Sequence, residues 1–223
     1  MQSKSQAPSI TTGPITAQLM LFFFPILLGT FFQQLYNTVD TIIVGNFVGT
    51  NTALAAVGGA TGQLVNLFVG FFIGLSSGCG VIISQYYGAK DQNAVSKSVH
   101  TALAFSLLSG VVIMVLGLAL TDFSLRAMSL PEEIMPEATA YLRIFFLGMI
   151  PNLFYNMGAA VLRAIGDSKR PLYFLILSCL CNIVLDLIFV AYLRLGVSGA
   201  ALATILSQLA SAVMVLFVLL RTK

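Results

Sequence analysis

Asp40 and Asp186 are acids inside long apolar stretches, and polar residues stand at helical spacing beside each of them. Asp40 follows Tyr36 by four residues, so the two side chains share one helix face, and Gln33 and Asn37 lie near that face. Hydrocarbon offers polar groups no partner, so an acid within a membrane span is a functional-site hypothesis by default. The alternative, that Asp40 only ends a helix at the membrane surface, fits the local spacing equally well.

The second acid closes a stripe of three polar residues. Ser178, Asn182 and Asp186 recur at i, i+4 intervals in an otherwise apolar segment, and Thr204 and Gln208 form a similar pair in the next segment. One interhelical hydrogen bond needs one polar group. A stripe that ends in an acid therefore favours a functional role.

The composition is that of a polytopic membrane protein. Of the 223 residues, 58% are hydrophobic and 9% are charged, whereas a soluble domain carries about 25% charged residues. The net charge is only +3. Residues 1–14 are polar, and the apolar run after them is too long for a signal-peptide core, so we expect no cleaved signal.

Six apolar segments are each long enough to cross a bilayer, which takes about 20 residues. Pro25 lies in the first segment, where it removes a backbone hydrogen bond and can kink the helix. The predicted fold class is therefore all-α. We expect a polar cytoplasmic N-terminus at 1–14, a six-helix lobe at 15–220 with spans at about 15–44, 53–86, 95–120, 138–163, 171–193 and 199–220, and the start of a cytoplasmic linker at 221–223.

The Lys and Arg residues predict the orientation. With the N-terminus inside, eight of them fall on the cytoplasmic side and three (Arg126, Arg143 and Arg194) fall outside, so both termini should be cytoplasmic. Asp40 is then late in an outward helix, Asp186 is late in another, and Thr204 is early in an inward one. All three are expected in the outer half of the membrane, as a shared polar pocket requires.

The sequence gives little support to enzymatic, metal-binding or nucleic-acid-binding functions. The three cysteines lie in apolar runs, and His100 is the only histidine, which disfavours zinc sites and most acid–base sites. Gly74-Leu-Ser76-Ser-Gly78 matches a nucleophile pattern, but it sits in an apolar helix without a nearby base. We expect no catalytic residues, no enzyme activity and no nucleic-acid partner.

Several stretches, taken in order, resemble the multidrug and toxic compound extrusion (MATE) family of transporters. They are the spacing of Pro25, Tyr36 and Asp40, and the segments LYNTVDTIIVG (35–45), ISQYYGAKD (83–91), VLRAIGDSKRP (161–171) and CNIVLDLIFV (181–190). The similarity runs from about residue 14 to the end of the chain. It implies twelve helices in two six-helix lobes, of which this chain resembles the N-terminal lobe.

The resemblance also implies a function and a site. The family's usual activity is antiport of cationic amphiphilic compounds against H⁺ or Na⁺ across a prokaryotic plasma membrane, without a cofactor. Many prokaryotic members bind the ion in the N-lobe, which carried over by position implies Asp40, Asp186 and Asn182, with Tyr36 and Thr204 as hydrogen-bonding partners. Na⁺ at Asp40 and Asp186 is the one metal ion envisaged. Weaker candidates for the cavity are Asn156, Gln33, Asn37, Gln63, Asn66, Ser178 and Gln208.

Alternatives remain open at this stage. One is a flippase for lipid-linked precursors of related architecture, which should have a more cationic cavity. Another is a half-transporter that moves nothing by itself. The expected partners are cationic drug-like substrates, the lipid bilayer and a second six-helix lobe, which is either in the same polypeptide or in a second copy of the chain. The sequence leaves open the substrate, the coupling ion and the oligomeric state.

Overall fold

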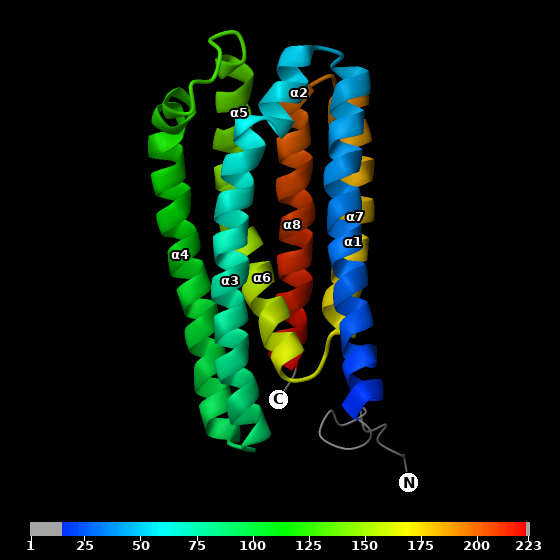
Figure 1. Ribbon diagram of the computed structural model, residues 1–223, viewed down its shortest axis with the longest axis vertical. Coiled ribbons are helices and arrows are strands. Elements are labelled where there is room, and N and C mark those ends of the chain that lie inside the picture. Colours follow the sequence, from blue (N-terminus) through cyan, green and yellow to red (C-terminus); the bar gives the residue numbers. More distant parts are fainter. Residues whose placement is uncertain (1–14, 222–223) are drawn as a thin grey trace.

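The computed structural model describes residues 15–221, and every element in that range is a helix (Figure 1). The polar N-terminus at 1–14 and residues 222–223 of the expected linker lie outside the described residues. The elements are α1 (Ile15–Phe47), α2 (Asn51–Gly58), α3 (Ala60–Gly88), α4 (Gln92–Ala127), α5 (Met135–Leu147), α6 (Met149–Ala164), α7 (Lys169–Asp186), the π-helix η1 (Leu187–Tyr192) and α8 (Gly196–Arg221).

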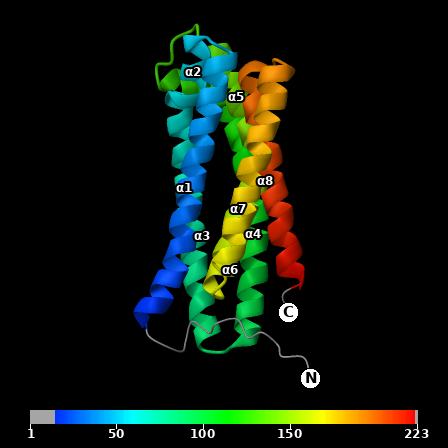
Figure 2. The same ribbon diagram turned by 90° about the vertical axis from the view of Figure 1, so that its right-hand side faces the viewer.

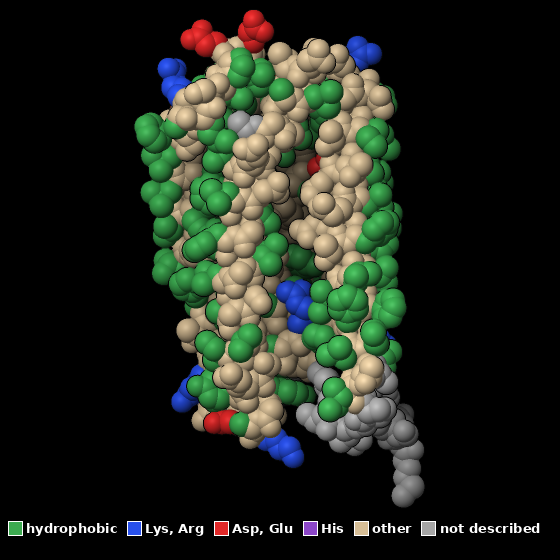
Figure 3. All heavy atoms as spheres, in the orientation of Figure 1, with side chains coloured by type: hydrophobic (Ala, Val, Ile, Leu, Met, Phe, Trp, Pro, Cys, Tyr) green, Lys and Arg blue, Asp and Glu red, His purple; other side chains and the backbone are tan. Residues whose placement is uncertain are grey.

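The helices form an elongated bundle that is long and apolar enough to cross a membrane. Five stretches pass that test alone, and α5 with α6 makes a sixth span, bent by 49°. Apolar side chains cover the sides of the bundle. Most charged side chains on the face in view collect at its two ends, and a few lie in the hollow between the helices (Figure 3). The chain is a multi-pass membrane protein. Its first and last described residues lie at the same end of the bundle (Figures 1 and 2).

Two stretches expected as single helices, 53–86 and 138–163, are interrupted at glycines. The chain breaks between α2 and α3 at Gly59, where a Cβ atom would lie 2.5 Å from the Ala55 carbonyl oxygen. The second break is at Gly148, where a Cβ atom would lie 2.6 Å from Cγ1 of Ile205 in α8. Glycine permits these close approaches because it has no side chain. The first break leaves α2 and α3 within one apolar stretch, Asn51–Gly88, and the second bends α5 against α6 by 49°, with both helices packed on α8.

The helix α4 is longer at both ends than the expected span of 95–120. It starts after Asp91, whose side chain accepts a hydrogen bond from the Ala94 N–H at 2.9 Å and so caps the helix. At its other end Asp122 pairs with Arg143 of α5 at 2.9 Å. The extra turns reach the loops at both ends of the bundle, where polar side chains meet water.

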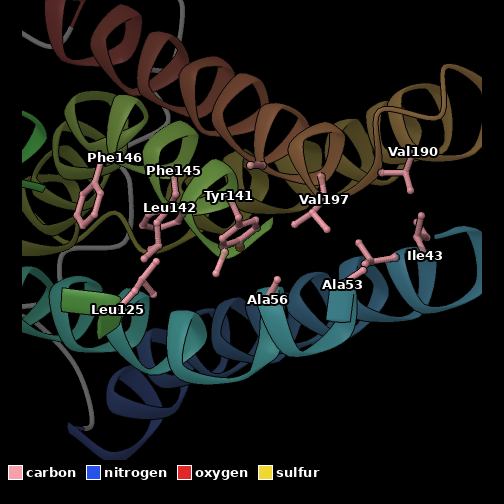
Figure 4. Packing of buried hydrophobic residues seen from close by; sticks show 14 of the residues in the cluster. Ile43, Ala53, Ala56, Leu125, Tyr141, Leu142, Phe145, Phe146, Val190 and Val197 are labelled. Atoms are coloured by element: carbon pink, nitrogen blue, oxygen red, sulfur yellow. The ribbon is translucent and has the colours of Figure 1, made fainter. Parts of the chain in front are cut away.

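The largest group of buried apolar residues lies at the end of the bundle where α1 meets α2 and where η1 meets α8. Figure 4 shows Ile43 of α1, Ala53 of α2 and Val190 of η1 turned toward one another. Val197 of α8 belongs to the same cluster. This cluster packs the end of α1 against η1, which continues α7, just beyond the two acids, so it fixes the positions of the helices that carry them.

Candidate functional site

Three helices bring the predicted polar residues together in the interior of the lobe. Asp40 comes from α1, Asn182 and Asp186 come from α7, and Thr204 comes from α8. These helices pack against one another, with α7 between α1 and α8. Asp186 and Asn182 are 0% exposed, and Asp40 is 7% exposed. In the described part of the chain neither acid takes part in an ion pair.

Asn182 bridges the two acids. With its amide nitrogen turned toward them, it donates hydrogen bonds to Asp40 Oδ1 at 2.8 Å and to Asp186 Oδ2 at 3.3 Å. The opposite amide orientation would set its oxygen against two acceptors. The two carboxyl groups also interact electrostatically with each other. One amide thus holds an acid of α1 and an acid of α7 in a single cluster.

Hydroxyl groups surround this pair. The Thr204 hydroxyl lies 3.4 Å from Asp40 Oδ2 and 3.0 Å from the Ala200 carbonyl oxygen, so it can donate to either one. The hydroxyl of Tyr36, one turn before Asp40, is buried and has no hydrogen-bond partner among residues 15–221. Oδ1 of Asp186 also lacks one. The cluster therefore retains an unused donor and an unused acceptor.

A cavity of about 260 Å³ opens beside Asp40 between α1, α3, α5 and α8. Figure 3 shows a hollow between the columns of atoms of α3 and α1, with acidic atoms visible inside its upper part. The described residues that line the cavity include one acid and many amides, and none is Lys or Arg. The polar and aromatic ones are Gln33, Gln34, Tyr36, Asn37, Asp40, Asn66, Tyr141, Phe145, Asn152, Thr204 and Gln208.

The structure distributes the weaker candidates among three places. Gln33, Asn37, Asn66 and Gln208 line the large cavity, as the sequence suggested for them. Asn156 and Ser178 do not reach it and instead line a smaller cavity of about 50 Å³. Gln63 is exposed and lines neither cavity, because it lies in the turn of α3 above Asn66, near the break at Gly59. Helix α1 continues through Pro25, so a hinge there stays a prediction.

Several lining residues were not proposed as site residues from the sequence. Tyr141 of α5 contributes its ring to the cavity wall, and no spacing pattern in the sequence marks it. Asn152 lies one turn from Asn156, and the amide of Asn156 donates to its side-chain oxygen at 3.0 Å. That i, i+4 pair was a usable signal. Ser207 and Ser211, one turn apart on α8, were another.

A family model described as MatE matches residues 25–188, a range that includes Asp40, Asn182 and Asp186. The chain belongs to the MatE family. This assignment confirms the resemblance found in the sequence. Two relatives from Bacillus subtilis (strain 168) are named as probable multidrug resistance proteins. YpnP is 35% identical over 91% of this chain and 45% of its own length, and YoeA is 36% identical over 98% and 48%.

Solved MATE structures share the fold. One described as MATE in the bent conformation superposes with a TM-score of 0.87 at 31% identity, covering 95% of this chain and 47% of that one. A transporter from Pyrococcus furiosus, whose description reports a binding pocket of reverse polarity and suggests a different function, gives 0.89 at 29%, covering 97% and 48%. This MatE chain therefore spans about half the length of the curated relatives it matches, as one lobe would, and those relatives include bacterial proteins named for multidrug resistance or export.

Proposed function

We propose that this MatE chain is the ion-binding lobe of a secondary active transporter that exports cationic, amphiphilic compounds in exchange for protons. The observation that carries the proposal is the pair of buried acids, Asp40 and Asp186, joined by Asn182 beside an open polar cavity. Two negative charges this close in an apolar interior repel each other, so a bound cation stabilises the pair.

Competition for the acids supports antiport. A proton removes one of the two negative charges of the pair, and a cationic substrate in the cavity is attracted by the ionised form of Asp40, which lines the cavity wall. Each ligand thus weakens the binding of the other, and such reciprocal coupling is what exchange transport requires. No covalent step and no cofactor is needed.

The amide of Asn182 favours H⁺ over Na⁺ as the coupling ion. It presents a nitrogen donor to both acids, whereas a metal cation needs oxygen ligands. A proton needs only the acids themselves.

The lining of the cavity supports a cationic substrate and disfavours the flippase alternative. A lipid-linked precursor carries phosphate groups, which Arg and Lys recognise best. The described lining residues instead offer Asp40 and amides such as Gln33, Asn66 and Asn152, with aromatic rings from Tyr141 and Phe145. An acid with flat rings suits a cationic amphiphile.

The fold and the family membership support the rest of the proposed transporter. A second six-helix lobe, in the same polypeptide or in a second copy, would complete the transport path. The end of the bundle that carries the loops at 88–92 and 164–169 would face the cytoplasm of a prokaryotic cell. The chain of 223 residues can be expressed alone and its oligomeric state measured by crosslinking in membranes. If it exports dye while it is a monomer, the requirement for a second lobe is wrong.

Gradient-driven transport tests the coupling. The protein expressed from its own gene would be reconstituted in vesicles that contain ethidium, and an inward proton gradient or an inward Na⁺ gradient would be imposed in separate experiments. We expect the proton gradient to drive ethidium efflux and the Na⁺ gradient to drive none. Efflux with the Na⁺ gradient alone would overturn proton coupling, and efflux with neither would overturn antiport.

A further inference from the structure

The cavity of about 50 Å³ is lined by Tyr36 and Ser178, each one helical turn from the acid cluster, and it extends toward the end of the bundle that carries the loops at 88–92 and 164–169. Helix α8 runs toward that end, so Thr204, Ser207 and Ser211 descend along it in order. Helix α7 runs the other way, so Ser178 lies below Asn182. The polar groups therefore form a file that extends the site along the bundle axis.

The two cavities adjoin one another. Gln33, Tyr36, Asn152 and Gln208 line both of them. At this junction the Tyr36 hydroxyl is buried without a hydrogen-bond partner in the part of the chain that is described, which is costly in a membrane interior. A water molecule in either cavity would satisfy it.

The serines of the file leave acceptors free. Ser207 donates to the Thr204 carbonyl at 2.8 Å, Ser178 donates to the Ser207 carbonyl at 2.8 Å, and Ser211 donates to the same carbonyl at 3.3 Å. A hydroxyl that donates its one hydrogen still has lone pairs to accept from water. All three serines are buried, so water within the cavity is the one solvent that can reach them.

The file reaches the inner end of the bundle through Tyr155 of α6. Its hydroxyl donates to the carbonyl of Pro171, in the first turn of α7, at 3.2 Å. Arg163, in the last turn of α6, interacts electrostatically with Tyr155. The hydroxyl of Tyr155 thus links the cavity to the start of α7, next to the loop at 164–169.

The size of the cavity decides what it can carry. A water molecule takes about 30 Å³, so about 50 Å³ accommodates one or two. Drug-sized ligands need pockets of about 300–1,000 Å³. Protons that pass along water molecules and hydroxyl groups fit within a cavity of this size.

We propose that the smaller cavity is a hydrated path by which protons pass between the Asp40–Asp186 pair and the cytoplasmic side, within this lobe. The path leads away from the larger cavity, which it adjoins and which admits the substrate. The inference rests on the proposed proton-coupled function. It assigns Ser178, Ser207 and Ser211 to proton movement and not to substrate binding.

The test replaces Ser211 with an apolar group that fills the cavity. The protein expressed from its own gene would be reconstituted in vesicles that contain a pH-sensitive dye. The dye would report proton movement driven by an ethidium gradient, and ethidium binding at equilibrium would be measured separately. We expect Ser211→Val to slow proton movement about tenfold or more and to change ethidium affinity less than about twofold, because an apolar constriction excludes water. Ser211→Thr keeps the hydroxyl and should stay near the wild-type rate.

Ser106→Val is the matched control. Ser106 of α4 is buried, donates to a backbone carbonyl of its own helix and lines neither cavity, so the same substitution should leave the rate unchanged. A wild-type rate of proton movement in Ser211→Val would overturn the proposed path but not the proposed function. A loss of ethidium binding that matches the loss of rate would do the same. No proton movement in the wild-type protein would overturn the proposed function, and the path with it.

A second measurement does not depend on a cavity-filling variant. The native thiol of Cys179 lines the small cavity, so Ag⁺, a small ion that reacts with thiols in water, serves as a probe. With Cys79 and Cys181 replaced by serine, Ag⁺ added from the cytoplasmic side should slow proton movement, and Cys179→Ser should abolish that effect. Insensitivity of the protein that retains Cys179 would contradict a hydrated path.

Discussion

At the scale of single residues, the acid pair explains why Asn182 is an amide. Both acids are buried, although Asp40 still lines the larger cavity, and a buried carboxyl without a donor destabilises the fold by about 1–3 kcal/mol. Asn182 supplies two N–H donors from one side chain and adds no charge. A lysine or arginine in its place would neutralise one acid permanently, and the pair would lose its need for an exchangeable cation.

The acids themselves provide the first prediction. Asp40→Asn and Asp186→Asn remove one charge each while nearly preserving the side-chain shape. We expect each to reduce drug export in cells at least about tenfold, at matched expression, because the exchangeable cation loses its anionic partner. Substrate binding by the wild-type protein should increase with pH as protons leave the pair, and this dependence should flatten in both variants.

The control for these variants is Asp122→Asn. Asp122 lies in an exposed ion pair with Arg143, and such pairs contribute little to stability, so export should stay close to wild type. Wild-type export and unchanged pH dependence in both Asp40→Asn and Asp186→Asn would make these acids structural residues.

The bridging amide gives a second prediction. Asn182→Leu has a similar volume but leaves both acids without their shared donor. We expect the free energy of unfolding to fall by about 1–3 kcal/mol, as for other buried groups that lose a partner. Thermal unfolding in detergent would measure it. An unchanged midpoint would mean that Asn182 does not hold the pair.

Sequence reasoning anticipated part of this residue arrangement. Helix direction and depth placed Asp40, Asp186 and Thr204 at one level, and the structure brings them together. The bridging geometry of Asn182 was out of reach, because it depends on how far α1 lies from α7. Tyr141 was missed for a similar reason: only the bend at Gly148 sets the direction of α5 relative to the cavity.

At the scale of elements, the contact between α6 and α8 depends on a single missing side chain. Gly158 of α6 lies so close to Val215 of α8 that a Cβ atom would overlap its Cγ1 atom. Gly158→Ala should therefore destabilise the lobe by about 1–3 kcal/mol, the usual cost of overpacking. Unfolding of the purified protein by heat or denaturant would show the change.

A matched variant separates crowding from helix propensity. Nothing lies within 4 Å of the position where a Cβ atom would stand on Gly78, which is also inside a helix. Gly78→Ala should be neutral or stabilise the protein by up to about 1 kcal/mol, because alanine favours helix. Equal destabilisation by both substitutions would rule out the crowding explanation.

The sequence predicted how many apolar segments the chain has, but it did not predict where two of those segments are interrupted. Periodicity and length gave the six segments, but the breaks at Gly59 and Gly148 lie in apolar runs that look continuous. Gly70, Gly74 and Gly78 also lie in an apolar run, yet within the described residues nothing lies within 4 Å of a Cβ atom placed on any of them. Tertiary contacts alone decide which glycine is needed.

At the scale of the whole molecule, the distribution of Lys and Arg makes a prediction about orientation. Cysteines introduced at Lys90 and Lys169, after replacement of the native ones, should be shielded from impermeant thiol reagents in intact cells. A cysteine at Glu133, in the loop at the opposite end, should be labelled. Labelling of Lys169→Cys from outside would reverse the proposed orientation.

The link between Asp40 and Thr204 joins residues 164 positions apart in the chain. A ribosome adds about 5–20 residues per second, so Asp40 is made on the order of ten to thirty seconds before its partner exists. Only 6% of the most apolar stretch of α1 is buried even in the finished lobe. During synthesis, helix α1 therefore has to wait at the insertion machinery or in lipid with an unpartnered acid near its end. The speed and order of translation thus become part of how this lobe assembles.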